Sequence, residues 1–501
     1  MRATRIFGLL IGLCLGSMIL PAQTPQPRDL PLRVELETAK DAQDYHHALV
    51  GKQGVMVFYE GNETDGDTTM WILMHYDTNL VKQGNYKIAL PKKSDYKIAC
   101  YSKGHLYLLF QKIPKKKEKD TVKTRVIDVD FIHDQISLIS LPELTNTDIV
   151  LMDRVGESLL FVVARESDYA LSFYHLSDHR WQDYRDRMPA FITLEFCEAD
   201  TLAHHLLCGG QMFDGKKTEW KLVSMDFEGA IVYSETFPEI QEKQYRTARL
   251  AVLDSAKYLI MGTFSIANRK ENSGEHDGIY AFGIDRGTTS SPLSYRYDEI
   301  RARDSAISKQ APAKTGAQDL KYFIGSLFAG ENQFAIVAEV FYPEYTTAYQ
   351  PSTYDPFWGG YGGSVPVTTF AGYRYIHAIV GACDTAGRLL WNAYLPFNDL
   401  ITKQIVPRVS LFFPDRQVVI YYLYNASLTF MMMDQNEVIE PLSSLKLEGL
   451  DHRDVVEYSR GARVDKWYNH YFLASGYQYI KNSVKVKEYR YVFFLSKLRF
   501  E

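Results

Sequence analysis

The sequence predicts an all-β fold, a single β-propeller with eight blades, or seven as the alternative. A short apolar strand runs into an Asp-led turn seven times along the chain, and the leaders are Asp77, Asp130, Asp178, Asp226, Asp285, Asp384 and Asp434. Most leaders lie about 50 residues apart, the length of one four-stranded blade. Aromatic residues make up 14% of the chain, which suits half-buried pleated sheets.

The two clearest turns begin at Asp226 and Asp384, and each has a Gly three residues later and an aromatic residue four positions after the Gly. An Asp carboxylate can accept a hydrogen bond from the backbone N–H two residues on, and Gly adopts the positive φ that closes such a turn. We expect the aromatic residue that follows, Tyr233 or Trp391, to pack between neighbouring sheets.

One step between leaders is longer than the others, because 384 − 285 gives 99 residues. A polar connector at 287–318 and an aromatic loop insertion at 343–370 account for the excess and leave one normal blade core. Arg301–Gln310 is expected to form one short helix. A final unit ends near Leu498, and Leu32–Glu37 is a candidate for the strand that closes the ring. A series of two-sheet sandwiches is the alternative fold.

The first 22 residues have the layout of a secretory signal peptide. Arg2 and Arg5 precede an apolar stretch, Ile6–Leu20, and Ala22 offers a small residue for cleavage. The apolar stretch is shorter than the about 20 residues of a membrane-spanning helix. The sequence therefore predicts an exported protein of the periplasm or cell surface, with one propeller domain at 23–501 and no stable membrane span after cleavage.

The charge distribution argues against a nucleic-acid partner. The net charge is −5 over 501 residues, and the one dense basic run is Lys115–Lys119. This run separates two strand-like segments, so we expect it at a solvated hairpin tip.

Four cysteines remain after cleavage of the signal peptide. Cys197 and Cys208 flank a turn near Asp200–Ala203, so they could face each other and form a disulfide, or be two separately buried thiols. Cys100 and Cys383 are expected to be lone core residues.

The sequence contains no recognisable catalytic or metal motif. His-Glu-x-x-His, paired Cys-x-x-Cys and Gly-x-Ser-x-Gly patterns are absent. His46–His47 and His204–His205 are adjacent pairs, and neighbours on a strand point to opposite faces. Gly359–Gly363 is rich in Gly but precedes no helix. We therefore predict no cofactor and no metal, identify no catalytic residues, and favour a binding protein over an enzyme.

Two resemblances follow from these motifs. The pattern Ala382-x-Asp384-x-x-Gly387-x-x-x-Trp391 resembles the tryptophan-docking motif of quinoprotein-like propellers, although it is one residue shorter before the Gly and only two units keep it in full. No quinone cofactor is implied. The stretch Val340–Asn392, together with the signal end, resembles uncharacterised exported proteins of Bacteroidota-type bacteria, which implies an exported propeller but no activity.

The aromatic loop insertion is the predicted binding site. Aromatic side chains among small residues are typical of protein and sugar recognition. The predicted binding residues are Tyr345, Tyr349, Tyr354, Phe357, Trp358 and Tyr361. The other possibility is that these rings fold back and plug the propeller face.

The predicted function is therefore a cell-envelope binding or scaffold protein whose propeller loops engage an envelope protein or a surface glycan. The alternative is a propeller enzyme that acts on glycans as a hydrolase or lyase. Such an enzyme would need converging Arg, Asp, Glu, Tyr or His side chains near the propeller axis.

Overall fold

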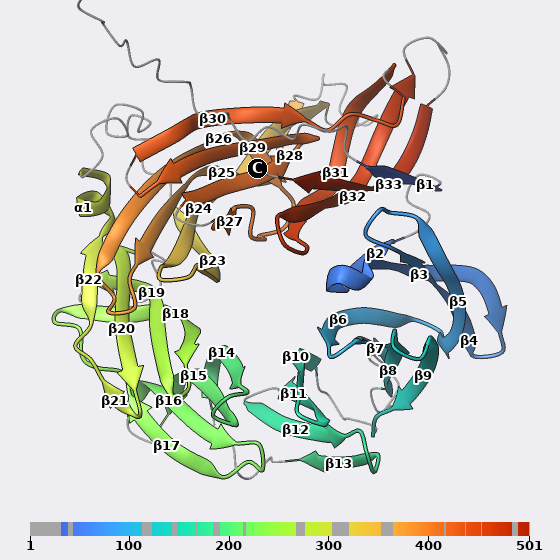
Figure 1. The fold of residues 1–501 in the computed structure, drawn as a ribbon. Helices are drawn as coiled ribbons and strands as arrows, with labels where there is room; N and C mark the ends of the chain where they lie inside the picture. The colour runs from blue at the N-terminus through green and yellow to red at the C-terminus, as the bar shows by residue number, and fades with distance from the viewer. Residues whose placement is uncertain are drawn as a thin grey trace, which may run out of the picture.

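Eight antiparallel sheets form a ring, as Figure 1 shows for this computed structural model. The structure describes residues 32–38, 44–112, 123–142, 148–165, 168–183, 191–213, 217–266, 276–302, 320–351, 364–414, 417–435, 437–451, 453–482 and 489–499. The prediction of an all-β propeller is confirmed, and the ring has eight blades. The predicted signal peptide and the predicted hairpin tip at Lys115–Lys119 lie outside the described residues.

The first four blades are regular four-stranded sheets. Blade 1 consists of β2 (His46–Leu49), β3 (Val55–Asp65), β4 (Thr68–Tyr76) and β5 (Lys82–Pro91), with the short helix η1 (Gly51–Gln53) after β2. Blade 2 consists of β6 (Ser94–Ser102), β7 (His105–Lys112), β8 (Lys123–Asp130) and β9 (Gln135–Ser140). Blade 3 consists of β10 (Asp148–Val155), β11 (Ser158–Ala164), β12 (Tyr169–His175) and β13 (Arg180–Asp183). Blade 4 consists of β14 (Phe191–Asp200), β15 (His205–Phe213), β16 (Thr218–Asp226) and β17 (Ile231–Thr236).

Of the last four blades, blades 5 and 6 carry the additions to the basic pattern, and blade 8 is completed by β1. Blade 5 consists of β18 (Lys243–Asp254), β19 (Lys257–Ile266), β20 (Gly278–Asp285), β21 (Thr288–Thr289) and β22 (Leu293–Arg296), followed by α1 (Tyr297–Ala302). Blade 6 consists of β23 (Lys321–Ala329), β24 (Phe334–Pro351), β25 (Ser364–Cys383) and β26 (Leu389–Thr402). Blade 7 consists of β27 (Ser410–Phe412), β28 (Gln417–Tyr424), β29 (Ser427–Asp434) and β30 (Glu437–Lys446). Blade 8 consists of β31 (Asp454–Lys466), β32 (Tyr471–Asn482), β33 (Tyr489–Arg499) and β1 (Arg33–Thr38).

The polar connector predicted at 287–318 contains regular structure in its described part. Strands β21 and β22 both pair with β20, and α1 follows them. Helix α1 covers Tyr297–Ala302, with Asp298 and Glu299 in its first turn. Of the short helix expected at Arg301–Gln310, residues 303–310 lie outside the described residues. Acidic residues at a helix N-terminus interact favourably with its exposed N–H groups. No described helix is long and apolar enough to cross a membrane.

The hydrophobic core consists of eight layers, one between each pair of neighbouring blades. Trp391 is 2% exposed and packs in the layer between blades 6 and 7, and Tyr233 packs between blades 4 and 5. Both placements confirm the packing expected for the aromatic residue of the Asp-led turn. The indole N–H of Trp391 donates to Gln333 Oε1 of its own blade at 2.7 Å.

All seven Asp leaders lie in the hairpin between the third and fourth strands of a blade. Asp226 Oδ1 accepts hydrogen bonds from the N–H groups of Glu228 (3.0 Å) and Ala230 (2.7 Å), and Gly229 has φ +79. Asp384 makes the same pair of bonds at 2.9 Å each. The mechanism predicted for these turns is confirmed.

Seven such turns serve eight blades because blade 8 receives its fourth strand from the other end of the chain. Strand β1 pairs antiparallel with β33, and in Figure 1 it is the dark-blue strand beside the red ones. The closing strand predicted at Leu32–Glu37 is thereby confirmed. Blade 8 needs no turn after β33, so the repeat count falls one short of the blade count.

Buried charges hold this closing strand in place. Glu35 accepts from Arg33 Nε at 2.8 Å and from Arg490 Nη2 at 2.8 Å, and Arg490 Nη2 also donates to Asp454 Oδ2 at 2.5 Å. The side chains of Arg33, Glu35, Asp454 and Arg490 are 3%, 4%, 0% and 23% exposed. We call these four residues the closure clasp.

Candidate functional site

The aromatic insertion of blade 6 lies on the face of the ring opposite the Asp-led turns. Because the strands of each blade alternate in direction, second-to-third connections and connections between blades emerge on one face, and the other two turns of each blade emerge on the other. The insertion joins β24 to β25, the second and third strands of blade 6. It therefore shares its face with the long connections, including that of α1.

In its described part the insertion is a β-ribbon and not an irregular loop. Strands β24 and β25 pair from Phe334 to Pro351, where Pro351 pairs with Ser364, and the register shifts after Val340 and again after Glu344. The segment Tyr345-Thr346-Thr347-Ala348-Tyr349 consists mostly of aromatic and β-branched residues, and Val365–Thr369 is rich in β-branched residues, so both segments favour extended backbone. Frequent Pro and Gly residues, and the lack of a clear alternation, obscure these strands in the sequence. We call residues 345–351 and 364–370 the blade-6 ribbon.

Both edges of the blade-6 ribbon lack a neighbouring strand among the described residues. Strand β23 pairs with β24 only as far as Phe341, and β26 pairs with β25 only as far as Tyr373. The described residues 345–349 are all exposed, as are 366 and 368–370. Exposed sheet edges carry free N–H and C=O groups that can pair with another chain, and proteins usually protect them with charged residues. The ribbon contains no charged residue.

Three of its rings are exposed on one face of the ribbon. Tyr345 is directly opposite Phe370, and Tyr349 follows four residues later on the same strand. Tyr345, Tyr349 and Phe370 are 59%, 71% and 40% exposed. Of the predicted binding residues, Tyr345 and Tyr349 therefore point away from the propeller and do not plug it. Tyr354, Phe357, Trp358 and Tyr361 lie outside the described residues.

A continuous series of ring contacts ties the ribbon to the core. The ring centroids of Tyr345 and Phe370 are 5.7 Å apart, those of Phe370 and Tyr373 are 5.0 Å apart, and Tyr373 contacts the buried Phe341 edge-to-face at 5.7 Å. Each such contact contributes about 0.5–1.5 kcal/mol beyond area burial. An isolated two-stranded ribbon is only marginally stable in water. These ring contacts therefore stabilise the ribbon at its base and fix the direction in which it projects.

An ion pair adds to the same base. Arg374 donates from Nε and Nη2 to the two carboxylate oxygens of Glu344, both at 2.9 Å. Such a two-point pair restricts rotation as well as separation. The exposed rings thus stand on a rigid support.

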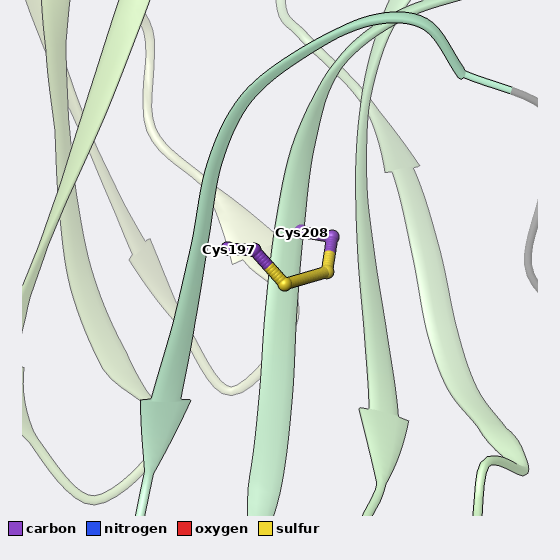
Figure 2. Close-up of a disulfide and its surroundings, with 2 residues drawn as sticks. All are labelled: Cys197 and Cys208. Carbon is purple, nitrogen blue, oxygen red and sulfur yellow. A yellow bond between two sulfur atoms is a disulfide. The ribbon is translucent and has the colours of Figure 1, made fainter. Parts of the chain in front are cut away.

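The second predicted site, the cysteine pair, lies inside blade 4. Cys197 of β14 and Cys208 of β15 are in direct register, and their sulfurs are joined as a disulfide (Figure 2). Both residues are buried, at 5% and 0% exposure, so the disulfide belongs to the core between blades 3 and 4 and offers nothing to a ligand. Cys100 and Cys383 are free; burial raises the pKa of each thiol to about 12.

A polar cluster that sequence reasoning missed lies where blade 8 meets blade 1. His47 Nε2 is 3.1 Å from Asp465 Oδ2 and 3.3 Å from Arg463 Nη2, and Arg463 Nε donates to Asp465 at 2.9 Å. Burial lowers the pKa of His47, while its hydrogen bond to Asp465 partly opposes the shift. Residues more than 400 positions apart meet here, so no local pattern could have revealed them. We call His47, Arg463 and Asp465 the seam cluster.

The seam cluster is arranged as a structural contact. The His47 side chain is 5% exposed, and its Nε2 atom faces Asp465 and Arg463. His46 points the other way and packs against Phe58 and Tyr96, which confirms that adjacent histidines on this strand face opposite sides. No group of three described His, Cys, Asp or Glu residues could hold a metal ion.

Comparison with known proteins identifies similar scaffolds only at low identity. No protein-family model and no curated protein sequence matches the chain. The β-propeller domain of the Trilobed protease from Pyrococcus furiosus is 9% identical with a TM-score of 0.36, covering 81% of this chain and 95% of that one. The polysaccharide lyase Uly1 is 9% identical with a TM-score of 0.42, covering 91% and 99%. An acylaminoacyl peptidase of Pyrococcus horikoshii is 8% identical with a TM-score of 0.36, covering 79% and 52%. Identities this low carry no inference about activity.

Proposed function

We propose that this chain is an exported binding propeller that holds a partner protein on the blade-6 ribbon. The observation that carries the proposal is a projecting, uncharged β-ribbon with three exposed rings on one face, whose two edges pair with no other strand in the described part of the chain. An extended segment of a partner can add to such an edge as a further strand, with main-chain hydrogen bonds giving affinity. The rings then supply the apolar anchors that dominate most interfaces.

The alternatives for the ribbon are less well matched to its chemistry. A glycan has no peptide backbone that can pair with the free edges. It would contact the rings, and the N–H and C=O groups of the edges would stay hydrogen-bonded to water. Export rests on the apolar segment Ile6–Leu20, and N-terminal sequencing of protein from the native host should begin near Gln23.

Site-specific photo-crosslinking in the native host tests the proposal. A photoreactive residue replaces Tyr349 on the ribbon, and a matched variant carries it at Val232, which is 48% exposed on blade 4. We expect a discrete cross-linked protein from position 349 only. The cross-link should disappear when Tyr345 and Phe370 are both changed to Ser, because the anchoring rings are then gone.

A ribbon deletion provides the complementary test. Replacing residues 345–370 by a short Gly-Ser turn keeps the Glu344–Arg374 pair at the base, so the variant should fold with an unchanged far-UV circular dichroism spectrum. It should lose the cross-linking partner in co-purification. A folded deletion variant that still holds the same partner would remove the ribbon from the binding site.

The alternative function, a glycan-active enzyme, can be tested at the seam cluster, where His, Arg and Asp side chains converge. Asp465 to Asn keeps the shape of the side chain but removes the charge that faces His47 and Arg463. A glycan-degrading activity of the purified protein that this variant abolishes, in a fold that stays intact, would favour the enzyme over the binding protein.

A further inference from the structure

A second group of aromatic residues lies on blade 8, away from the ribbon. Tyr458, Tyr479 and Tyr491 are directly opposite one another on β31, β32 and β33, and Tyr489 lies two residues from Tyr491 on the same sheet face. Their rings touch: the centroids are 5.3 Å apart for Tyr458–Tyr479, 4.5 Å for Tyr479–Tyr491 and 5.2 Å for Tyr479–Tyr489. We call these four residues the tyrosine row.

The tyrosine row is the uncovered end of a face that blade 1 otherwise covers. The next pair along the same two strands, Tyr477 and Phe493, packs against blade 1, where Phe493 stacks on Tyr45 at 5.2 Å. At the row this cover ends, and Tyr458 and Tyr489 are 41% and 47% exposed. Strands β31 to β33 therefore extend past their neighbouring blade and carry four rings with them.

The row is rigid because its reverse side is held by the closure clasp. Arg490 lies between Tyr489 and Tyr491, points to the opposite face and binds Asp454 and Glu35. Within the row, the hydroxyls of Tyr458 and Tyr491 are 2.7 Å apart, and the ring planes of Tyr479 and Tyr489 are within 8° of parallel. Sites built on fixed strands hold their geometry better than sites on loops.

We propose that the tyrosine row is a glycan-binding platform. The outer rings of the stack, Tyr458 and Tyr489, are 41% and 47% exposed. An exposed phenol offers an apolar ring and a hydroxyl, and a pyranose offers an apolar C–H face bordered by hydroxyls, so the two are complementary. The Lys481 ammonium lies 5.6 Å from the Tyr489 ring centroid and adds a donor for sugar oxygens at the edge. The central part of a protein–protein interface is usually depleted of charged residues, whereas this platform has Lys481 and Glu457 beside it.

The position of the tyrosine row in the ring also fits a binding site. It lies at the end of the strands next to the connection from β32 to β33, a second-to-third connection like that of the ribbon. Both sites therefore face the same side of the propeller. A protein that holds a partner on one blade and a glycan chain on another can join the two.

Binding of defined oligosaccharides to the full chain tests the inference. Cellohexaose, chitohexaose and an alginate hexamer are titrated separately by calorimetry, so that neutral, acetamido and acidic chains are all represented. We expect saturable binding of at least one of them. Changing both Tyr458 and Tyr489 to Ala should weaken that binding by about tenfold or more, since aromatic anchors commonly contribute over 1 kcal/mol each.

Two controls separate this site from the ribbon. Tyr349 to Ala removes an even more exposed ring from the ribbon and should leave oligosaccharide affinity unchanged. Tyr489 to Phe keeps the ring and should retain binding. The ribbon deletion should lose the cross-linked partner but keep the oligosaccharide, so either site can fail without the other.

Three results would overturn the inference: no hexasaccharide binds the wild-type chain, the double Ala variant binds as tightly as wild type, or the row is required only for holding the protein partner. If the double variant does not fold, Tyr489 to Ala alone decides, because Tyr489 is the first residue of β33 and is nearly half exposed.

Discussion

Removal of one charge from the closure clasp should destabilise the whole ring. In a Glu35 to Ala variant, Arg33 and Arg490 lose the carboxylate to which they donate at 2.8 Å. The Arg33 side chain is 3% exposed, so water cannot replace the lost partner. Breaking a buried ion pair by removing one member costs about 3–5 kcal/mol, because the remaining charge stays buried.

The expected shift in melting temperature follows from the size of the domain. At roughly 2.1 cal/mol/K per residue and about 470 residues, the unfolding entropy is about 1 kcal/mol/K, so Tm should fall by about 3–5 °C. Differential scanning calorimetry measures this shift. Glu63 to Ala is the matched control, because Glu63 pairs with Lys87 at 2.7 Å but both side chains are largely exposed. That change should cost under about 1 kcal/mol.

A second variant separates the effect of an unpaired buried charge from the effect of lost side-chain packing. Changing Arg33 to Met and Glu35 to Leu together removes both charges and leaves Arg490 paired with Asp454. Replacing buried ions by apolar residues of similar volume is often neutral or stabilising. We expect the double variant to recover most of the stability. A Glu35 to Ala variant as stable as the Glu63 to Ala variant would refute the reasoning.

Three further predictions concern single positions. Peptide mapping without reduction should find Cys197 linked to Cys208 in exported protein, and two free thiols would contradict the pairing. Asp384 to Ala should cost about 1–2 kcal/mol in chemical denaturation, since two backbone N–H groups lose their acceptor. Burial alone would raise the pKa of Asp384, but hydrogen bonds from Arg388 and Ala386 lower it overall, so the cost should shrink as the pH falls below 3.8. Burial raises the pKa of Glu339 from 4.5 to about 7, although hydrogen bonds from two backbone N–H groups oppose the shift. The protonated Glu339 side chain therefore contributes to the stability of the fold below pH 4.5, and this contribution is lost as the pH rises through 7. Glu339 to Gln should therefore gain stability relative to wild type between pH 5 and pH 8, by up to about 3 kcal/mol, and equal pH profiles would exclude this.

The sequence predicted those parts of the fold whose signal is local. An Asp-led turn involves five consecutive residues, so Asp226 and Asp384 reveal it without any knowledge of the rest of the chain. The closing strand at Leu32–Glu37 was predictable because the propeller repeat requires a fourth strand at the end that lacks a turn. The ribbon was located by its aromatic residues, but its strand pairing was hidden by Pro and Gly.

The remaining features depend on register between distant strands. The tyrosine row joins Tyr458 to Tyr491 only because a bulge between Arg460 and Arg463 shifts β31 by one residue relative to β32. The seam cluster joins His47 to Asp465 through the closure of the ring. None of these alignments is encoded in a short segment.

The pairing of β1 with β33 also determines when the protein can complete its folding. Arg33 reaches Ser496, 463 residues later, so β1, the first described strand, cannot pair until β33, the last described strand, has been synthesised. Contacts so distant in sequence form slowly. Such a delay would favour translocation, because the ring cannot close before β33 has been synthesised. A product truncated before β33 would leave the clasp unformed and expose a sheet edge that quality-control proteases could recognise.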